Sequence, residues 1–181
     1  MKTLINLLIL SILVSAQSFG QLYITQVGET NFFSETPMEN ISAVNKTVGS
    51  IINTATNEVA VSMRMNSFDF PNKLMQEHFN ENYMESGKFS TATFKGKINE
   101  TIDYTKPGTY DVSATGQFTV HGVAKPKTIK GKLTVEAQKL SLVSDFDVSL
   151  TDHNIEIPQL VFVKIAQVIK VKNKFVFLPK K

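Results

Sequence analysis

Three histidines, His78, His121 and His153, are the side chains of this sequence best suited to metal chemistry. Imidazole nitrogens are common ligands for zinc and other transition metals, and Glu77 or Asp152 could add a carboxylate oxygen. The spacing contains neither an H-x-x-x-H nor an H-x-H pair, and isolated histidines more often serve as hydrogen-bonded structural groups. A histidine-dependent metalloenzyme is therefore one hypothesis, and it ranks below a structural role for these residues.

The other residues that commonly carry catalysis form no recognisable constellation. The chain has no cysteine, no G-x-S-x-G motif and no glycine-rich phosphate loop. Asp145 and Asp147 come closest to a carboxylate pair, but their two-residue spacing places both on the solvent face of a predicted strand. The favoured interpretation is a protein that is not an enzyme, with no catalytic residue, bound metal or cofactor.

The charge balance narrows the range of partners. Lys and Arg number 19 against 16 Asp and Glu, for a net charge of +3, which gives no argument for nucleic-acid binding. The late lysines, within 125–132 and 170–174, recur mainly at every second position. This spacing is typical of the solvent side of strands, and a membrane-surface patch is the alternative. Transient membrane contact and a homodimer both stay open, because a small net charge permits self-association without arguing for it.

The N-terminal residues have the pattern of an export signal. Lys2 gives a positive start, residues 4–14 form an apolar core, and small side chains follow at a cleavage site. The apolar run is too short to span a bilayer core of about 30 Å. We expect a signal peptide at 1–20, cleaved after Ala16 or Gly20, and hence an exported protein that is periplasmic or extracellular.

The rest of the chain, 21–181, is predicted to be a single all-β domain. Apolar and polar residues alternate with a period of two in about eight to ten runs, and short turns between them favour antiparallel hairpins. A barrel and a sandwich would both hide the strand edges, and the long runs favour a tall barrel. The clearest runs are 58–65, 109–122, 127–136, 142–150 and 169–177, and the weaker ones are 22–26, 30–34, 41–45, 48–53 and 92–105.

One short segment, near 73–85, has helical spacing instead. Asn72 is suited to cap its start, and Gly87 is suited to end it. An apolar stripe at i, i+4 and i+8 can pack inward while the opposite face meets water. We therefore predict a lid-like helical insert of about three turns in the strand pattern. Its stripe consists of Met75, Phe79 and Tyr83.

The periodicity leaves open whether the barrel interior is a packed core or an apolar pocket. Gly96, Gly116 and Gly131 fall on the apolar faces of their strands, which suits either strong strand coiling or room for a guest molecule. The large apolar side chains suit both interiors equally. They are Phe33, Met63, Phe68, Phe79, Phe94, Phe118 and Phe146, with Met75 and Tyr83 on the insert.

Several segments resemble signature elements of the YceI-like family. Residues 116–126, GQFTVHGVAKP, are similar to that family's G-x-L-T-[IV]-H-G-V-T-K-P element, and residues 154–158 are similar to its later Gly-Ile-x-Ile-Pro turn. The elements match those of the family in order and spacing, and the resemblance covers the chain from about Gln21 to Phe177. A further signature loop and strand consists of His78, Tyr83, Glu85, Lys88, Phe89 and residues 93–96.

The resemblance implies a lipocalin-like, up-and-down antiparallel barrel of about eight strands, exported from the cell. It also implies an elongated apolar cavity that holds a polyisoprenoid or similar long-chain amphiphile, for transport or storage. The alternative is that the same residues form an ordinary core, in an envelope or stress protein whose filled barrel acts through protein partners. The implied tail contacts are Val61, Met63, Met75, Phe79, Phe94, Phe118, Val120, Phe146 and Val148, and the implied mouth residues are His78, Tyr83 and His121.

Overall fold

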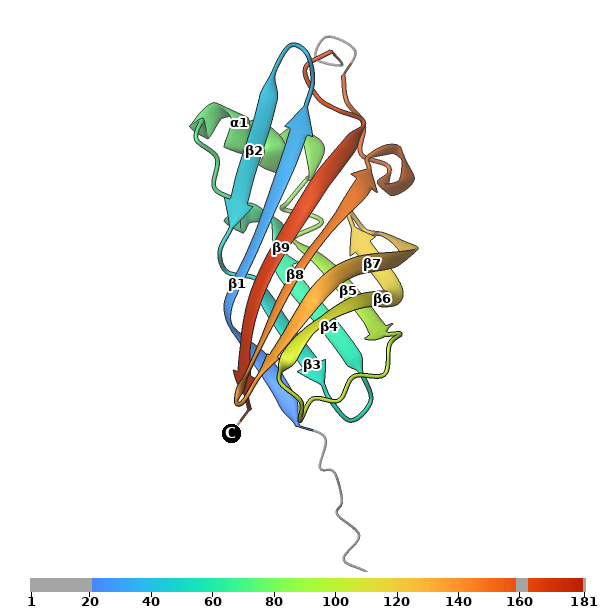
Figure 1. Cartoon of the computed structure of the whole chain (residues 1–181). Helices are drawn as coiled ribbons and strands as arrows, with labels where there is room; N and C mark the ends of the chain where they lie inside the picture. The colour runs from blue at the N-terminus through green and yellow to red at the C-terminus, as the bar shows by residue number, and fades with distance from the viewer. Residues whose placement is uncertain (1–20, 159–162, 181) are drawn as a thin grey trace, which may run out of the picture.

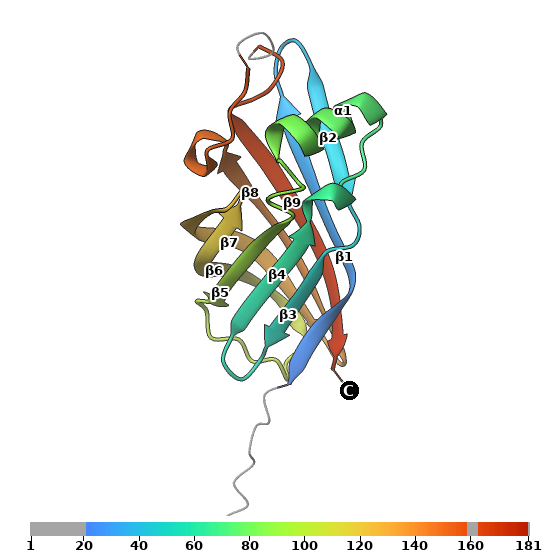
Figure 2. The same cartoon turned by 180° about the vertical axis from the view of Figure 1, so that it is seen from behind.

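The computed structural model describes residues 21–158 and 163–180, and the predicted signal peptide at 1–20 lies outside them. Nine antiparallel strands form one sheet in the order β2-β1-β3-β4-β5-β6-β7-β8-β9, and β1 also pairs with β9, which closes the sheet into a barrel (Figures 1 and 2). The strands are β1 (Leu22–Glu35), β2 (Asn40–Asn45), β3 (Gly49–Asn53), β4 (Glu58–Arg64), β5 (Thr91–Ile98), β6 (Gly108–Val120), β7 (Val123–Glu136), β8 (Lys139–Ser149) and β9 (Val168–Pro179).

The closed ring has eight strand positions, because β2 and β3 share one edge of β1. β3 pairs with residues 22–24 at the start of β1, and β2 pairs with residues 30–35 at its end. β3 pairs onward with β4, whereas the outer edge of β2 meets the chain at a single bridge, between Val44 and Asp69, among the described residues. The wall therefore has a gap beside β2. The predicted all-β, lipocalin-like antiparallel barrel with a short helix is confirmed.

A β-bulge in β1 changes which of its side chains face inward. The pairing with β9 shifts register between Thr25 and Val27, so the two runs predicted at 22–26 and 30–34 are one strand with opposite phase on either side of the bulge. Phe32 consequently packs against the core. The prediction that Phe33 points inward is wrong, since its ring lies beneath the Lys172 ammonium on the next strand, 5.2 Å from ring centroid to Nζ.

Glycines draw β5 and β6 together. Gly96 and Gly116 are directly opposite each other in the two strands. A Cβ on Gly116 would collide with the carbonyl oxygen of Lys95, and one on Gly96 would lie 2.6 Å from that of Thr115 and 2.8 Å from the Phe94 ring. Of the two expectations for these glycines, the structure fits strand coiling: the ring of Phe94 covers Gly96 and leaves no room there for a guest.

The end of the barrel at which β1 pairs with β3 is a packed core. Its largest fully buried side chains come from β3, β7, β8 and β9, on opposite sides of the ring. They interdigitate across the interior, as side chains of small barrels do. They are Ile52, Leu133, Leu140, Phe175 and Phe177.

The predicted helical insert covers the gap beside β2. It consists of α1 (Lys73–His78) followed directly by a π-helical turn, η2 (Phe79–Tyr83), in which the Met84 amide donates to the Phe79 carbonyl at 2.8 Å. Both views place α1 next to β2 (Figures 1 and 2). The predicted end at Gly87 is wrong, because Glu85 takes the left-handed conformation, with φ of 42°, and ends the helix there. No helix within 21–158 or 163–180 is long and apolar enough to cross a membrane.

We predict that Gly116→Ala destabilises the barrel by about 1–3 kcal/mol, because the new methyl group would force β5 and β6 apart. Urea-induced unfolding followed by circular dichroism measures the change. Gly87→Ala is the matched control, since a Cβ at Gly87 meets no atom within 4 Å. It should change the free energy of unfolding by less than about 0.5 kcal/mol. Equal effects of the two substitutions would contradict the close approach of the two strands.

Candidate functional site

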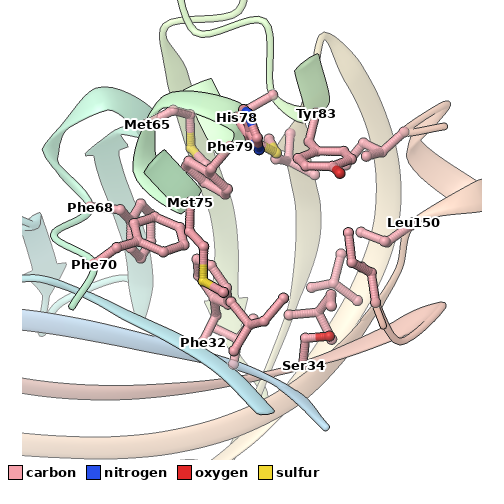
Figure 3. Close-up of a pocket in the computed structure, with 18 of the residues that line it drawn as sticks. Phe32, Ser34, Met65, Phe68, Phe70, Met75, His78, Phe79, Tyr83 and Leu150 are labelled. Carbon is pink, nitrogen blue, oxygen red and sulfur yellow. The ribbon is translucent and has the colours of Figure 1, made fainter. Parts of the chain in front are cut away.

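The half of the barrel beneath the helical insert is hollow. The described residues surround a cavity of about 350 Å³ whose walls are overwhelmingly apolar (Figure 3). That volume lies within the range of about 300–1,000 Å³ typical of small-molecule sites. The lining residues come from α1 and η2, from the upper parts of the barrel strands, and from the segments before α1 and β9. The barrel therefore combines the two predicted interiors, with a packed core at one end and a pocket at the other.

An aromatic cluster joins the helical insert to the barrel wall. The ring of Phe79 lies 5.4 Å from that of Phe32, 5.7 Å from Phe68 and 5.0 Å from Phe70, measured between ring centroids. Figure 3 shows these rings grouped on one side of the cavity, with Tyr83 and Leu150 across from them. Aromatic pairs at such distances contribute about 0.5–1.5 kcal/mol each beyond the burial of their surface. Phe79 is thus both a wall of the cavity and the anchor of its lid.

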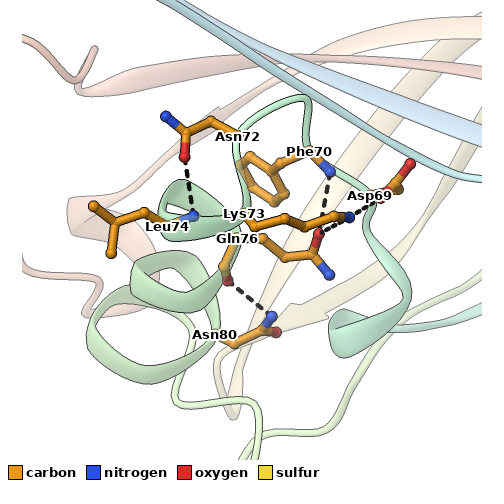
Figure 4. Close-up of polar contacts among 7 residues, drawn as sticks. All are labelled: Asp69, Phe70, Asn72, Lys73, Leu74, Gln76 and Asn80. Carbon is orange, nitrogen blue, oxygen red and sulfur yellow. Dashed lines mark hydrogen bonds and ion pairs between the residues drawn. The ribbon is translucent and has the colours of Figure 1, made fainter.

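Polar contacts fix the start of the insert (Figure 4). The Asn72 side chain accepts a hydrogen bond from the Leu74 amide at 2.9 Å, which confirms it as the N-cap. The Lys73 ammonium donates to Asp69 at 2.7 Å, and this hydrogen bond holds the pKa of Asp69 below its usual value. The Gln76 side-chain oxygen accepts from Lys73 at 3.0 Å. These contacts are exposed, so they orient the helix more than they stabilise it.

Two aromatic rings form the floor of the cavity, with a chain of polar side chains next to them. Phe118 and Phe146 meet edge to face with centroids 5.4 Å apart, and both also line a second cavity of about 50 Å³ beneath them. Next to this pair, across β1 and β9, the Thr30 hydroxyl donates to the Asn173 side-chain oxygen at 2.7 Å. The Asn173 amide in turn donates to the Ser144 hydroxyl at 3.1 Å. The floor separates the pocket from the packed core.

Apart from Thr30 at the floor, the polar groups around the cavity are few and lie near its rim. Glu39 and Lys164 form an ion pair at 3.8 Å, and the Ser34 hydroxyl accepts from the Ala166 amide at 2.8 Å. The Tyr83 hydroxyl and the His78 imidazole make no hydrogen bond with another of the described residues. Burial raises the pKa of Tyr83, so its hydroxyl stays neutral and can donate to a ligand head group.

The cavity brings together most of the residues predicted for the site. Val61 and Phe94 lie instead on the small cavity below the floor, and His121 lines neither. Whether each residue contacts a ligand stays a prediction. The predicted residues that line the main cavity are Met63, Met75, His78, Phe79, Tyr83, Phe118, Val120, Phe146 and Val148.

His121 ties the end of the insert to the β6–β7 turn. Its Nε2 lies 2.9 Å from a carboxylate oxygen of Glu85, and its Nδ1 donates to the His153 carbonyl at 3.1 Å. The Phe89 ring packs edge-on against the imidazole, 4.4 Å between centroids. His121 has a left-handed backbone with φ of 51°, which the alternation of a regular strand does not anticipate. These contacts hold the imidazole away from the cavity.

The metal hypothesis finds no geometry to support it in the part of the chain that the structure describes. No three His, Asp or Glu side chains within 21–158 and 163–180 are placed to hold an ion. His153 is buried, and its Nδ1 donates to the Val123 carbonyl at 3.1 Å. Its ring packs edge-on against Phe118, 5.4 Å between centroids, so it supports the cavity floor from behind.

Several residues that line the cavity were not predicted from the sequence, some in strands and some in the segments that connect them. Phe70 alternates with Phe68 around the exposed Asp69, so a period-two signal was present, but it lies in the link between β4 and α1. Phe32 was missed because the bulge in β1 reverses the alternation. Ile155 and Ile157 alternate with the exposed Glu156 in the same way, but they lie in the segment between β8 and β9, outside the regular strands. The missed lining residues include Phe32, Ile41, Met65, Phe70, Met84, Leu150, Ile155, Ile157, Ile165, Ile169 and Val171.

A closed antiparallel barrel of eight strand positions with an apolar pocket inside it is typical of the lipocalin-like class of β-barrels. The sequence model of the YceI-like domain matches residues 23–177, and the chain belongs to this family. The resemblance drawn from the sequence is therefore confirmed. No protein among the curated sequences matches the chain.

Solved structures of the same fold include a polyisoprenoid-binding domain from Saccharophagus degradans implicated in plant cell wall breakdown. It has a TM-score of 0.72 at 15% identity and covers 89% of this chain and 99% of its own. BcnA from Burkholderia cenocepacia has a TM-score of 0.70 at 13% identity, over 82% and 95%. The YceI protein of Campylobacter jejuni has a TM-score of 0.58 at 16% identity, over 76% and 83%. At such identities the likeness establishes the fold.

The buried position of His153 predicts a loss of stability in acid. Burial lowers the pKa of His153 below its ordinary value of 6.5. As the pH falls, the unfolded chain therefore takes up a proton on this residue before the folded protein does. Its contribution to stability is complete above pH 6.5 and is lost as the pH falls towards the lower folded pKa, by at most about 1.4 kcal/mol per pH unit.

The measurement is the free energy of unfolding in urea between pH 7 and pH 5, about the range in which histidine titrates. His153→Gln is the matched variant, since its amide keeps an N–H donor and does not titrate. The variant should show a flatter pH dependence than the parent. An identical pH dependence in both proteins would contradict a neutral, buried His153.

Proposed function

We propose that this protein is an exported carrier or store of a polyisoprenoid or similar long-chain amphiphile. The observation that carries the proposal is the apolar cavity of about 350 Å³ between the lid and the Phe118–Phe146 floor. The pocket suits a hydrocarbon tail, and its few polar groups near the rim suit a small head group. The proposed ligand assignment comprises the lining residues named above, and no chemical step is needed for it.

The energetics of burial favour a ligand in this site. Each methylene group moved from water into an apolar pocket contributes about 0.8 kcal/mol. The side chains around an empty pocket also lack packing partners, because cavities lose the dispersion contacts of a close-packed interior. A tail between Met75 on the lid and Val148 on the wall would supply those contacts. Ligand binding should therefore raise the free energy of unfolding of the barrel.

A solved neighbour supports the choice of ligand class. The structure from Saccharophagus degradans is described as a polyisoprenoid-binding domain, and it covers 89% of this chain. We transfer that ligand class to the present chain as a proposal. The filled-barrel alternative, an envelope protein that acts only through protein partners, is less consistent with a cavity of this size.

We also propose that the rim meets a membrane transiently when the ligand is exchanged. Met38, Leu74 and Val163 are exposed apolar side chains, and each is a lining residue or the neighbour of one. An exposed apolar group near a pocket mouth is suited to contact with lipid. Flotation of the ligand-free protein with phospholipid vesicles would detect the contact. Self-association stays a prediction from the sequence alone.

Organic extraction of the protein, isolated from the exported fraction of its own cells, tests the function. We expect mass spectrometry of the extract to find an isoprenoid or another long-chain amphiphile bound at close to one molecule per chain. The intact mass of the same sample reports whether residues 1–16 or 1–20 have been removed. Repeated recovery of no lipid, together with no binding of added prenyl alcohols, would contradict the proposal.

Phe79→Asp should abolish ligand retention while leaving the barrel folded. A carboxylate in the aromatic cluster would lose its hydration without gaining a partner, so the lid should no longer close over the tail. We expect bound lipid to fall by at least about tenfold, which corresponds to 1.4 kcal/mol. Lipid content by mass spectrometry and β-sheet content by circular dichroism are the measurements. Phe33→Asp, on the outer face of β1, is the control and should retain its lipid.

A further inference from the structure

The interior of the barrel is divided at one level. The main cavity of about 350 Å³ and the lower cavity of about 50 Å³ have three lining residues in common, Met63, Phe118 and Phe146. These side chains come from β4, β6 and β8, on separate parts of the ring. They form a partition between the two cavities, and a tail that enters from the lid side meets it end-on.

Other side chains pack against the partition, and polar groups lie next to it. Phe118 is only 6% exposed, and the buried His153 ring packs against it. The Thr30–Asn173–Ser144 chain of hydrogen bonds occupies the side of the interior facing β1, β9 and β8. A hydrocarbon tail that continued past this level would lie against these part-buried polar groups, to which methylene groups offer no hydrogen bond. Below it lies the fully buried Phe175.

The volume above the partition sets a tail length. An engineered apolar cavity of about 150 Å³ in another protein holds a ring of six carbons, so 350 Å³ takes about fourteen carbons. We propose that the Phe118–Phe146 partition acts as a ruler that limits the bound tail to about fourteen carbons, close to the carbon number of three isoprene units. This inference rests on the proposed function and specifies the ligand: a short amphiphile fills the pocket, and a longer tail leaves its excess in water at the rim.

The test is a series of straight-chain primary alcohols from octanol to octadecanol. Each displaces a dansyl-labelled fatty acid from the full protein, at concentrations below those at which the alcohols aggregate. Affinity should rise by about fifteenfold for each two added carbons while the tail still fills the cavity. Beyond tetradecanol the gain should fall to about twofold or less for each step. The alcohol at which the gain in affinity falls is the break in the series, and it marks the tail length that the partition allows.

Two substitutions on β8 should move the break in opposite directions. Phe146→Ala removes the partition and joins the two cavities, so the break should move to hexadecanol or a longer alcohol. Val148→Phe places a ring just above the partition, on the same inward face, and the break should move to dodecanol or a shorter alcohol. Phe33→Ala, an outer-face control on β1, should leave the break unchanged. Val148→Phe keeps the test valid if Phe146→Ala does not fold, because it fills space instead of creating it.

The outcomes separate the ruler from the function on which it rests. If neither the probe nor any alcohol binds the wild-type protein, the proposed function fails. If the alcohols bind but affinity rises steadily through octadecanol, the ligand-binding function stands and the ruler is wrong. A break that does not respond to Val148→Phe, or that moves equally in Phe33→Ala, would also overturn the ruler. Opposite shifts in the two β8 variants would establish it.

Discussion

The sharing of one β1 edge by two strands is the constraint on which the rest of the structure depends. β1 pairs with β9 along most of its length, but its other edge is divided between β3 and β2. Only β3 has a further neighbour in the ring, β4. At one end of the molecule the wall is therefore continuous, and side chains meet across a narrow interior. At the other end the wall is interrupted, and a segment outside the sheet has to cover the gap.

The helical insert covers that gap and creates the pocket at the same time. The chain leaves β4, bridges to β2 at Val44 and Asp69, and returns to the barrel through α1 and η2. Phe79 then packs against aromatic rings of β1 and of the link before α1. Because the insert rests on this cluster at the wall, its remaining apolar stripe faces an interior that the strands do not fill. Packing and ligand binding are thus assigned to opposite ends of one barrel, with the Phe118–Phe146 pair between them.

Much of this arrangement can be predicted from period-two alternation and one helical stripe. The strands, their antiparallel order and the inward face of Met75, Phe79 and Tyr83 follow from residue spacing. Which side chains of β1 face inward could not be predicted, because no distinctive residue marks the bulge at Gln26. As a result Phe32 lies in the interior, where the alternation placed Phe33. His121 matched a family element in sequence, yet its left-handed backbone turns it towards Glu85. The division between core and pocket depends on the height of each residue along the barrel, which alternation does not encode.

The central claim is that a ligand tail lies between the lid and the aromatic floor. Nuclear Overhauser contacts between a bound, isotopically labelled prenyl alcohol and the methionine methyl groups test it most directly. We expect contacts from the middle of the tail to Met75 on the lid and from its terminal methyl to Met63 at the floor. Contacts confined to Met38 on the outer surface, or none to Met63 and Met75 in a saturated complex, would contradict this position of the tail.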